Sequence, residues 1–78
     1  MAEKTAWLNW NEQGKEWVLR LWEGDGWFYE DSWKIEERGV DKDGNSLDVV
    51  CDNALCYLAG LHDEGYVIKV TIGGNYHQ

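Results

Sequence analysis

The segment LDVVCDNALCYLAGLH, residues 47–62, carries the one unbroken helical apolar stripe in the chain. At about 100° per residue, seven of its side chains fall within one arc of roughly 140°, and polar or small residues take the opposite side. The seven are Leu47, Val50, Cys51, Ala54, Leu55, Leu58 and Leu61. This pattern predicts an amphipathic helix that must bury its stripe on a surface supplied by the flanking segments.

Those flanking segments alternate apolar and polar residues with the period of two that is typical of strands. Residues 5–10, 15–23 and 27–35 are predicted to form an antiparallel meander, with turns at 11–14 and 24–26. Residues 66–72 are predicted to form a last strand. The predicted fold is therefore α+β, a two-layer β-β-β-α-β arrangement in which one amphipathic helix packs on one face of the meander.

Strand alternation also predicts which side chains face the helix. The expected inner face consists of Leu8, Trp17, Leu19, Leu21, Trp27, Tyr29 and Ile35, together with Tyr66, Ile68, Val70 and Ile72 from the last strand. The expected outer face consists of Trp7, Val18, Arg20, Trp22 and Phe28.

The start of the helix allows two interpretations. In the first, Asn45 or Ser46 is the N-cap and Asp48 lies in the first turn, where it favours the helix dipole. In the second, residues 42–45 form a hairpin tip, residues 47–50 form a strand, and a shorter helix begins at Asp52. The first is preferred because the apolar stripe already begins at Leu47.

Seventy-eight residues suffice for one small domain, predicted to span residues 1–78 with a polar tail at 73–78. The chain opens without a signal sequence, and no apolar stretch approaches the ~20 residues that span a bilayer. Cys51 and Cys56 are five apart on the predicted helix, too far for a disulfide. These features predict a cytoplasmic protein with free thiols.

Charge is distributed unevenly along the chain. Of a net charge of −8, the segment 23–52 carries −7, because ten acidic residues there stand against three basic ones. Such a field repels nucleic acid and membranes and attracts basic protein surfaces. The ten are Glu23, Asp25, Glu30, Asp31, Glu36, Glu37, Asp41, Asp43, Asp48 and Asp52. The predicted partner is therefore a basic protein, of the kind that itself binds nucleic acid.

Motifs for catalysis or metal binding are weak. Asp41, Asp43 and Asn45, with Asp52 further on, are spaced somewhat like a calcium loop, but Gly44 falls at the fourth position rather than the sixth. A solvated turn that precedes a helix is the preferred interpretation. No zinc-ligand spacing, nucleophile pair or cofactor motif is present. We therefore predict a non-enzymatic protein without a cofactor.

Two tryptophans are candidates for binding. Trp7 and Trp22 alternate onto the sheet face that a single helix cannot cover, and an exposed aromatic patch is typical of a partner or ligand surface. Alternatively, neighbouring side chains or a second copy of the sheet in a homodimer cover them. The predicted partner-binding set consists of these two tryptophans and the ten acidic residues of segment 23–52.

In size and charge the chain is similar to small phage-encoded inhibitors of host defence, such as anti-CRISPR and antirestriction proteins. That resemblance implies a protein that blocks a basic nucleic-acid-binding surface on a host protein. Carboxylates ~6 Å apart on a helix or strand are sparser than the one charge per ~1.7 Å of a DNA duplex, so any nucleic-acid mimicry is partial.

Two alternatives remain open. The β-β-β-α-β order resembles the compact domain of HicB-type antitoxins, and residues 52–58, DNALCYL, resemble that family's helix. This likeness implies an antitoxin or adaptor module, although the DNA-binding segment usual in such antitoxins is not seen. The second alternative is a carbohydrate-binding module with Trp7 and Trp22 as a flat platform beside acidic residues.

Overall fold

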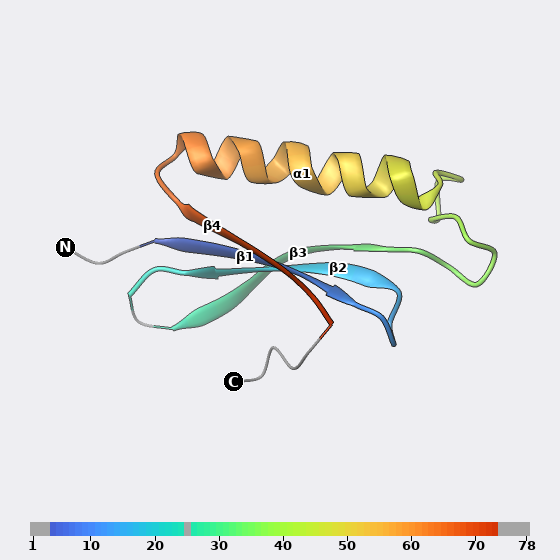
Figure 1. Ribbon diagram of the computed structural model, residues 1–78, viewed down its shortest axis with the longest axis horizontal. Helices are drawn as coiled ribbons and strands as arrows, with labels where there is room; N and C mark the ends of the chain where they lie inside the picture. The colour runs from blue at the N-terminus through green and yellow to red at the C-terminus, as the bar shows by residue number, and fades with distance from the viewer. Residues whose placement is uncertain (1–3, 25, 74–78) are drawn as a thin grey trace.

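The computed structural model describes residues 4–24 and 26–73. Three strands form an antiparallel meander, namely β1 (Thr5–Asn11), β2 (Glu16–Trp22) and β3 (Trp27–Lys34). Helix α1 (Leu47–Asp63) then covers one face of the sheet, and β4 (Val67–Ile72) returns beside β1. Figure 1 shows the two layers that result. The predicted α+β class is confirmed, whereas residues 74–78 of the predicted tail lie outside the described residues.

The sheet is mixed, with the strand order β3-β2-β1-β4. Because α1 carries the chain back along the sheet, β4 enters in the same direction as β1 and pairs with it in parallel, as such a helical crossover allows. Their register runs without interruption from the pair Thr5 and Val67 to the pair Trp10 and Ile72. The two edges of the sheet are therefore β3 and β4.

The first interpretation of the helix start is confirmed. Ser46 is the N-cap with an extended backbone, and Asp48 lies in the first turn. One feature of the second interpretation is also present, since Val40 and Ser46 form a short antiparallel bridge around a turn at residues 41–45. At the other end, Gly65 follows the helix with φ of 97°, a left-handed conformation that glycine adopts without strain.

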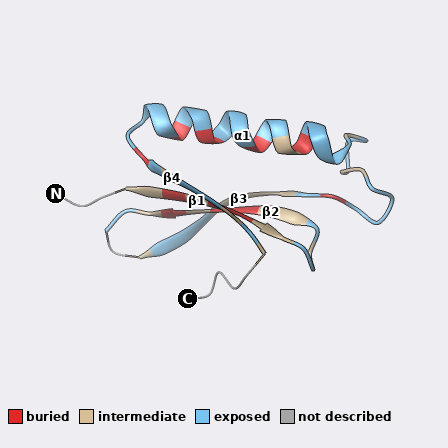
Figure 2. Ribbon diagram, in the orientation of Figure 1, coloured by how far each residue is buried: buried red, intermediate tan, exposed pale blue. Residues whose placement is uncertain are grey.

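The hydrophobic core lies between α1 and the centre of the sheet (Figure 2). It is built from Ala6, Leu8, Leu19, Leu21, Ala54, Leu58, Leu61 and Tyr66. The strand members come from β1 and β2, the two central strands, because these are the strands that α1 can cover fully. Trp17, Trp33 and Ile68 pack around this cluster as partly buried neighbours.

The buried side of the helix is narrower than predicted. Val50, Ala54, Leu58 and Leu61 are buried, whereas Leu55 is 52% exposed. Leu55 lies roughly 60° around the helix from Leu58, beyond the line of contact with the sheet.

Two other predicted stripe residues also differ from expectation. Leu47 lies on the buried line but at the first residue of the helix, where an open cavity rather than the sheet lies beside it, and it is exposed. Cys51, predicted as a core residue, is only half-buried and accepts a hydrogen bond from Trp17 Nε1 at 3.0 Å.

The last strand is less buried than predicted. Val70 pairs with Leu8 and Ile72 pairs with Trp10, so both stand on the helix-side face as expected. They are nevertheless 47% and 78% exposed. The reason is topological, since β4 is an edge strand and α1 packs over the sheet centre.

A β-bulge in β3 reverses part of the predicted face assignment. Leu19 pairs with Asp31 but Arg20 pairs with Tyr29, so Glu30 is an extra residue in β3. The strict period of two therefore breaks at Glu30, and the residues before it change faces. The prediction that Trp27 and Tyr29 face the helix and that Phe28 faces away is therefore wrong. Trp27 and Tyr29 lie on the sheet face opposite α1. Phe28 pairs with the core residue Leu21 and so lies on the helix-side face.

Candidate functional site

A groove of about 550 Å³ runs between the C-terminal half of α1 and strands β2 and β3. Its polar and aromatic walls come from the ends of several elements, so the groove exists only in the folded chain. We call it the acidic groove and define it by Glu23, Phe28, Glu30, Tyr57, Glu64 and Tyr66. The sequence-predicted residues Glu23 and Glu30 are thereby brought together.

Two tyrosine hydroxyls fix the positions of carboxylates in the acidic groove. Tyr57 Oη, on α1, donates to Glu30 Oε2 at 2.5 Å. Tyr66 Oη, just before β4, donates to Glu23 Oε2 at 3.0 Å. Hydrogen bonds to an ionised acceptor are shorter and stronger than neutral ones. The two contacts therefore hold both carboxylates against the groove wall without neutralising them.

The same geometry keeps both phenols protonated. The hydrogen bond to Glu30, followed by burial and by the charges of Glu30, Asp31 and Glu64, raises the pKa of Tyr57 to about 12. Burial, followed by the hydrogen bond to Glu23, raises the pKa of Tyr66. A tyrosinate would be repelled by its carboxylate neighbours. At neutral pH the groove therefore combines carboxylates with uncharged hydroxyl groups.

One lysine that does not line the groove contacts two of the groove residues. Lys4 Nζ lies 4.5 Å from the centroid of the Tyr66 ring and donates to the Glu64 backbone oxygen at 3.2 Å. A cation above an aromatic face is attracted by the negative π-surface. The chemistry of the site therefore suits ammonium and guanidinium groups, and the rings of Phe28 and Tyr57 offer further aromatic surface nearby.

Other predicted acidic residues lie elsewhere. Glu36 and Glu37 line a second, open cavity of about 1150 Å³ beside the β3–α1 connection, together with Lys15, Lys34 and Arg38. Basic side chains are thus mixed with acidic ones there. Asp25 is not among the described residues.

Asp41 is held within its own turn, and its neighbour Asp43 is exposed at the tip. Asp41 Oδ1 accepts the backbone N–H of Asp43 at 2.9 Å and that of Asn45 at 2.8 Å. These bonds lower the pKa of Asp41, with the bond from Asn45 the largest cause. The spacing that is similar to a calcium loop is thus used to close a turn.

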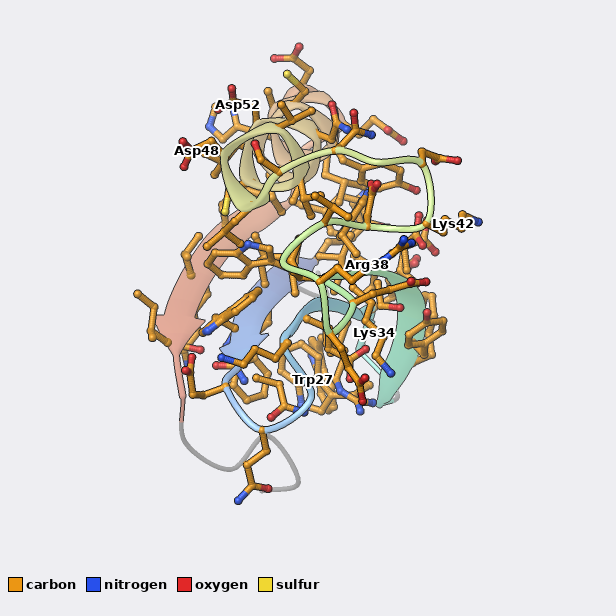
Figure 3. The ribbon with its side chains drawn as sticks, turned by 90° about the vertical axis from the view of Figure 1, so that its right-hand side faces the viewer. Trp27, Lys34, Arg38, Lys42, Asp48 and Asp52 are labelled. Atoms are coloured by element: carbon orange, nitrogen blue, oxygen red, sulfur yellow. The ribbon has the colours of Figure 1, made fainter. Side chains whose placement is uncertain are left out.

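Asp48 and Asp52 lie on α1, away from the acidic groove. Figure 3 shows both on the β4 side of the helix, whereas Lys42 and Arg38 lie on the other side. Those of the predicted acidic residues that the structure describes therefore do not form one continuous patch. Among them, Glu30 and Asp31 act on the pKa of Tyr57, and Glu23 and Glu30 act on the pKa of Tyr66.

We call the sheet face opposite α1 the open face, and it carries an aromatic cluster. The Trp27 ring lies 5.6 Å from Trp7 and 5.5 Å from Trp22, with interplanar angles of 62° and 51°. Trp7 and Trp22 are half-buried, and Trp27 is exposed. Neighbouring rings thus cover the two predicted tryptophans in part. The tilted rings do not present one flat platform of the kind that stacks on a sugar.

Four groove residues, Phe28, Tyr57, Glu64 and Tyr66, are absent from the predicted partner-binding set. The sequence pattern places Tyr57 on the predicted helix without a role, Tyr66 on the inner face and Phe28 on the outer face, and it assigns no role to Glu64. The sequence contains one signal for these residues, namely that the acidic residues Asp63 and Glu64 lie next to the aromatic Tyr66 at the end of the helix. Connecting these residues to Glu23 and Glu30 requires the strand order.

Among residues 4–24 and 26–73, no group of three or more His, Cys, Asp or Glu side chains could hold a metal ion. In the same residues, no helix has the length and apolar character to cross a membrane. The chain matches no protein-family model, no curated protein and no solved structure in the comparisons with known proteins. The functional argument therefore depends on the site itself.

Proposed function

We propose that the chain is a non-enzymatic acidic binding protein that docks on the basic, nucleic-acid-binding surface of a larger protein and blocks it. The observation that carries this proposal is the acidic groove, where Glu23, Glu30 and Glu64 from three elements converge beside aromatic rings. A groove of this kind receives an arginine or lysine side chain, because carboxylates pair with the charge and the rings with the aliphatic stem or cation.

Electrostatics favours a protein over a nucleic acid as the partner. A net charge of −8 opposes the approach of a phosphate backbone, whereas it accelerates association with a basic surface. Surfaces that bind nucleic acid are rich in the arginine and lysine side chains that the groove suits. Occupying such a surface excludes its nucleic acid, as phage-encoded inhibitors of anti-CRISPR and antirestriction type do.

The cellular setting proposed is the cytoplasm. Cys51 and Cys56 are both free thiols in the structure, and free thiols persist in reducing compartments. Nucleic-acid-binding host proteins are found in the same compartment. The carbohydrate-binding alternative gains no flat platform, since the tryptophan rings are tilted against one another.

The test uses two triple variants that remove the same charge from different places. The groove variant carries Glu23→Gln, Glu30→Gln and Glu64→Gln, in which the amide oxygens still accept the tyrosine hydrogen bonds. The control variant carries Glu36→Gln, Glu37→Gln and Asp43→Asn. Each is used to capture proteins from nuclease-treated bacterial lysate, and captured proteins are identified by mass spectrometry, purified and titrated with the chain in the presence of their nucleic acid.

We expect the wild-type chain to displace nucleic acid from a captured protein, with binding that weakens as salt is raised. The groove variant should bind at least about tenfold more weakly, while the control variant should stay close to wild type. Equal losses in the two variants would contradict the groove as the site. A captured protein that keeps its nucleic acid when saturated with the chain would contradict inhibition.

A further inference from the structure

The two edge strands of the sheet differ in how they are protected. Edge strands expose unpaired backbone groups, and proteins usually protect them with bulges, charges or proline. β3 has both a bulge at Glu30 and the adjacent charge of Asp31. β4, with the sequence VIKVTI, has neither a carboxylate nor a proline, and its pairing with β1 is regular throughout. β4 therefore presents an edge without a bulge.

The backbone groups at this edge can be assigned from the parallel ladder. Val67 N–H donates to Lys4 O at 2.8 Å, and Gly73 N–H donates to Trp10 O at 2.8 Å, both toward β1. Because backbone groups alternate sides along a strand, the N–H and C=O groups of the even-numbered residues point to the open edge. These residues are Ile68, Val70 and Ile72.

The side chains at the edge leave it accessible. Val70 and Ile72 project from the helix-side face and are 47% and 78% exposed. Lys69 carries the single charge of the strand. Its Nζ lies 5.2 Å from the centroid of the Trp7 ring on β1, so the side chain extends toward β1 and does not place its charge at the open edge. The edge is thus apolar on one face and uncharged where a further strand would pair.

We propose that β4 pairs antiparallel with β4 of a second copy of this chain, with the two Val70 residues directly opposite each other. A twofold axis perpendicular to the sheet then relates the copies, and their two sheets become one continuous sheet. In this register every outward-pointing residue meets another outward-pointing residue. Val70 faces its counterpart, Ile68 faces Ile72, and each opposed pair exchanges two backbone hydrogen bonds.

The strand is complementary to itself in this register. On the helix-side face, isoleucine and valine meet isoleucine and valine across the junction, and on the open face Lys69 meets Thr71. Centring the pairing on Lys69 instead would place two lysines opposite each other, which is unfavourable. The charge pattern therefore excludes the Lys69-centred register, and the Val70-centred one is preferred because it opposes apolar residues at all three outward-pointing positions, Ile68, Val70 and Ile72.

Among the residues that the structure describes, charge also favours the β4 edge as the place where a second copy binds. Each copy carries −8, so copies repel one another except where carboxylates are absent, and Val67–Ile72 contains none. Figure 3 shows two acidic side chains, Asp48 and Asp52, on the β4 side of α1. Their mutual repulsion across the axis is screened by salt, so this association should strengthen with salt, opposite to binding of a basic partner.

The experiment measures the mass of the purified chain by sedimentation and light scattering over a range of concentrations up to about 300 µM and at two salt concentrations. We expect a reversible monomer–dimer equilibrium that shifts toward dimer at high salt. Val70→Lys should weaken dimerisation at least about tenfold, because it opposes like charges at the axis. The matched control is Val67→Lys. Val67 is 51% exposed, but its backbone N–H is bonded to Lys4 O and so does not point to the open edge. The Val67→Lys variant should therefore dimerise like wild type.

A charge-swap mixture tests the register. Val70→Lys and Val70→Glu should each be monomeric alone but form a heterodimer when mixed, because only the Val70-centred register opposes these two side chains. Circular dichroism confirms that each variant is folded. A wild-type chain that remains monomeric throughout, equal weakening by the two lysine variants, or no heterodimer in the mixture would each overturn the proposal. None of these results depends on the groove or on its partner.

Discussion

Tyr57 Oη donates a 2.5 Å hydrogen bond to Glu30 Oε2, and this contact joins helix α1 to the residue that interrupts the register of β3. In a regular strand Glu30 and Asp31 would face opposite sides of the sheet. The bulge instead lets Glu30 reach the helix-side face together with Asp31, and both charges act on Tyr57. The irregularity of β3 thus helps to form the acidic groove.

The first prediction concerns the alkaline stability of the fold. The pKa of Tyr57 rises from an ordinary value of 10.0 to about 12, so the folded state holds this proton more tightly than the unfolded state does. Its stabilising effect is complete below pH 10 and is lost as the pH rises from 10 toward 12. Urea denaturation at successive pH values should show stability decreasing across that window, and tyrosinate absorbance should show a delayed titration.

The control for this prediction is Tyr57→Phe, which keeps the ring and removes the hydroxyl. It should lose part of the decline above pH 10, while the remainder reflects Tyr66, whose pKa is also raised. At neutral pH its stability should fall by no more than about 1 kcal/mol, because the bond is partly exposed to solvent. An alkaline profile identical to that of wild type would contradict the role of this hydrogen bond.

The helix and strands were predictable because each depends on a local period. Residues 47–62 and 16–22 show periods of 3.6 and two, and both elements are present. The position of a bulge is different, since it depends on how two strands align with each other. Trp27 and Phe28 were therefore assigned to the wrong faces, because a period of two was extended through Glu30.

The second prediction separates the two sides of the helix. Leu58 is buried in the core cluster, and Leu58→Ala should destabilise the fold by about 2–4 kcal/mol through lost burial and a residual cavity. Leu55 is half exposed, so Leu55→Ala should change stability by less than about 0.5 kcal/mol. Chemical denaturation of both variants measures the difference. Equal losses would mean that α1 is rotated from its position in the structure.

The candidate site was predictable only in its charge. The excess of acidic residues in segment 23–52 includes Glu23 and Glu30, which the fold brings into one groove. Tyr57 and Tyr66 could not be linked to them, because their contacts span 27 and 43 residues. Contacts of that separation are set by the strand order and by the place of α1 over the sheet, neither of which a local pattern reports.

The third prediction concerns a buried polar contact that connects β1 to β4. Asn9 is 2% exposed, its amide is hydrogen-bonded to the Thr71 hydroxyl, and Thr71 Oγ1 also accepts the Trp7 indole N–H at 2.7 Å. Asn9→Ala should destabilise the fold by about 1–3 kcal/mol, because it removes a buried amide and leaves the half-buried Thr71 hydroxyl with fewer partners. The control is Asn53→Ala on the exposed side of α1, which should have little effect. A denaturation midpoint for Asn9→Ala equal to that of the control would contradict this assignment.

The fourth prediction concerns acid. The Asp41 carboxylate accepts hydrogen bonds from the backbone of Asp43 and Asn45, and its pKa is lowered from the ordinary value of 3.8. The folded state therefore releases this proton more readily, so its contribution is present above pH 3.8 and is lost as the pH falls through the lowered pKa. Asp41→Ala should lower the melting temperature at neutral pH and flatten the dependence of stability on pH in the acid range. It should also speed amide hydrogen exchange at Asn45. The control is Asp43→Ala, at the exposed tip of the same turn, which should change neither the melting temperature nor the hydrogen exchange at Asn45. An equal loss of melting temperature in Asp43→Ala would show that the charge of the turn, rather than the Asp41 hydrogen bonds, stabilises the start of α1.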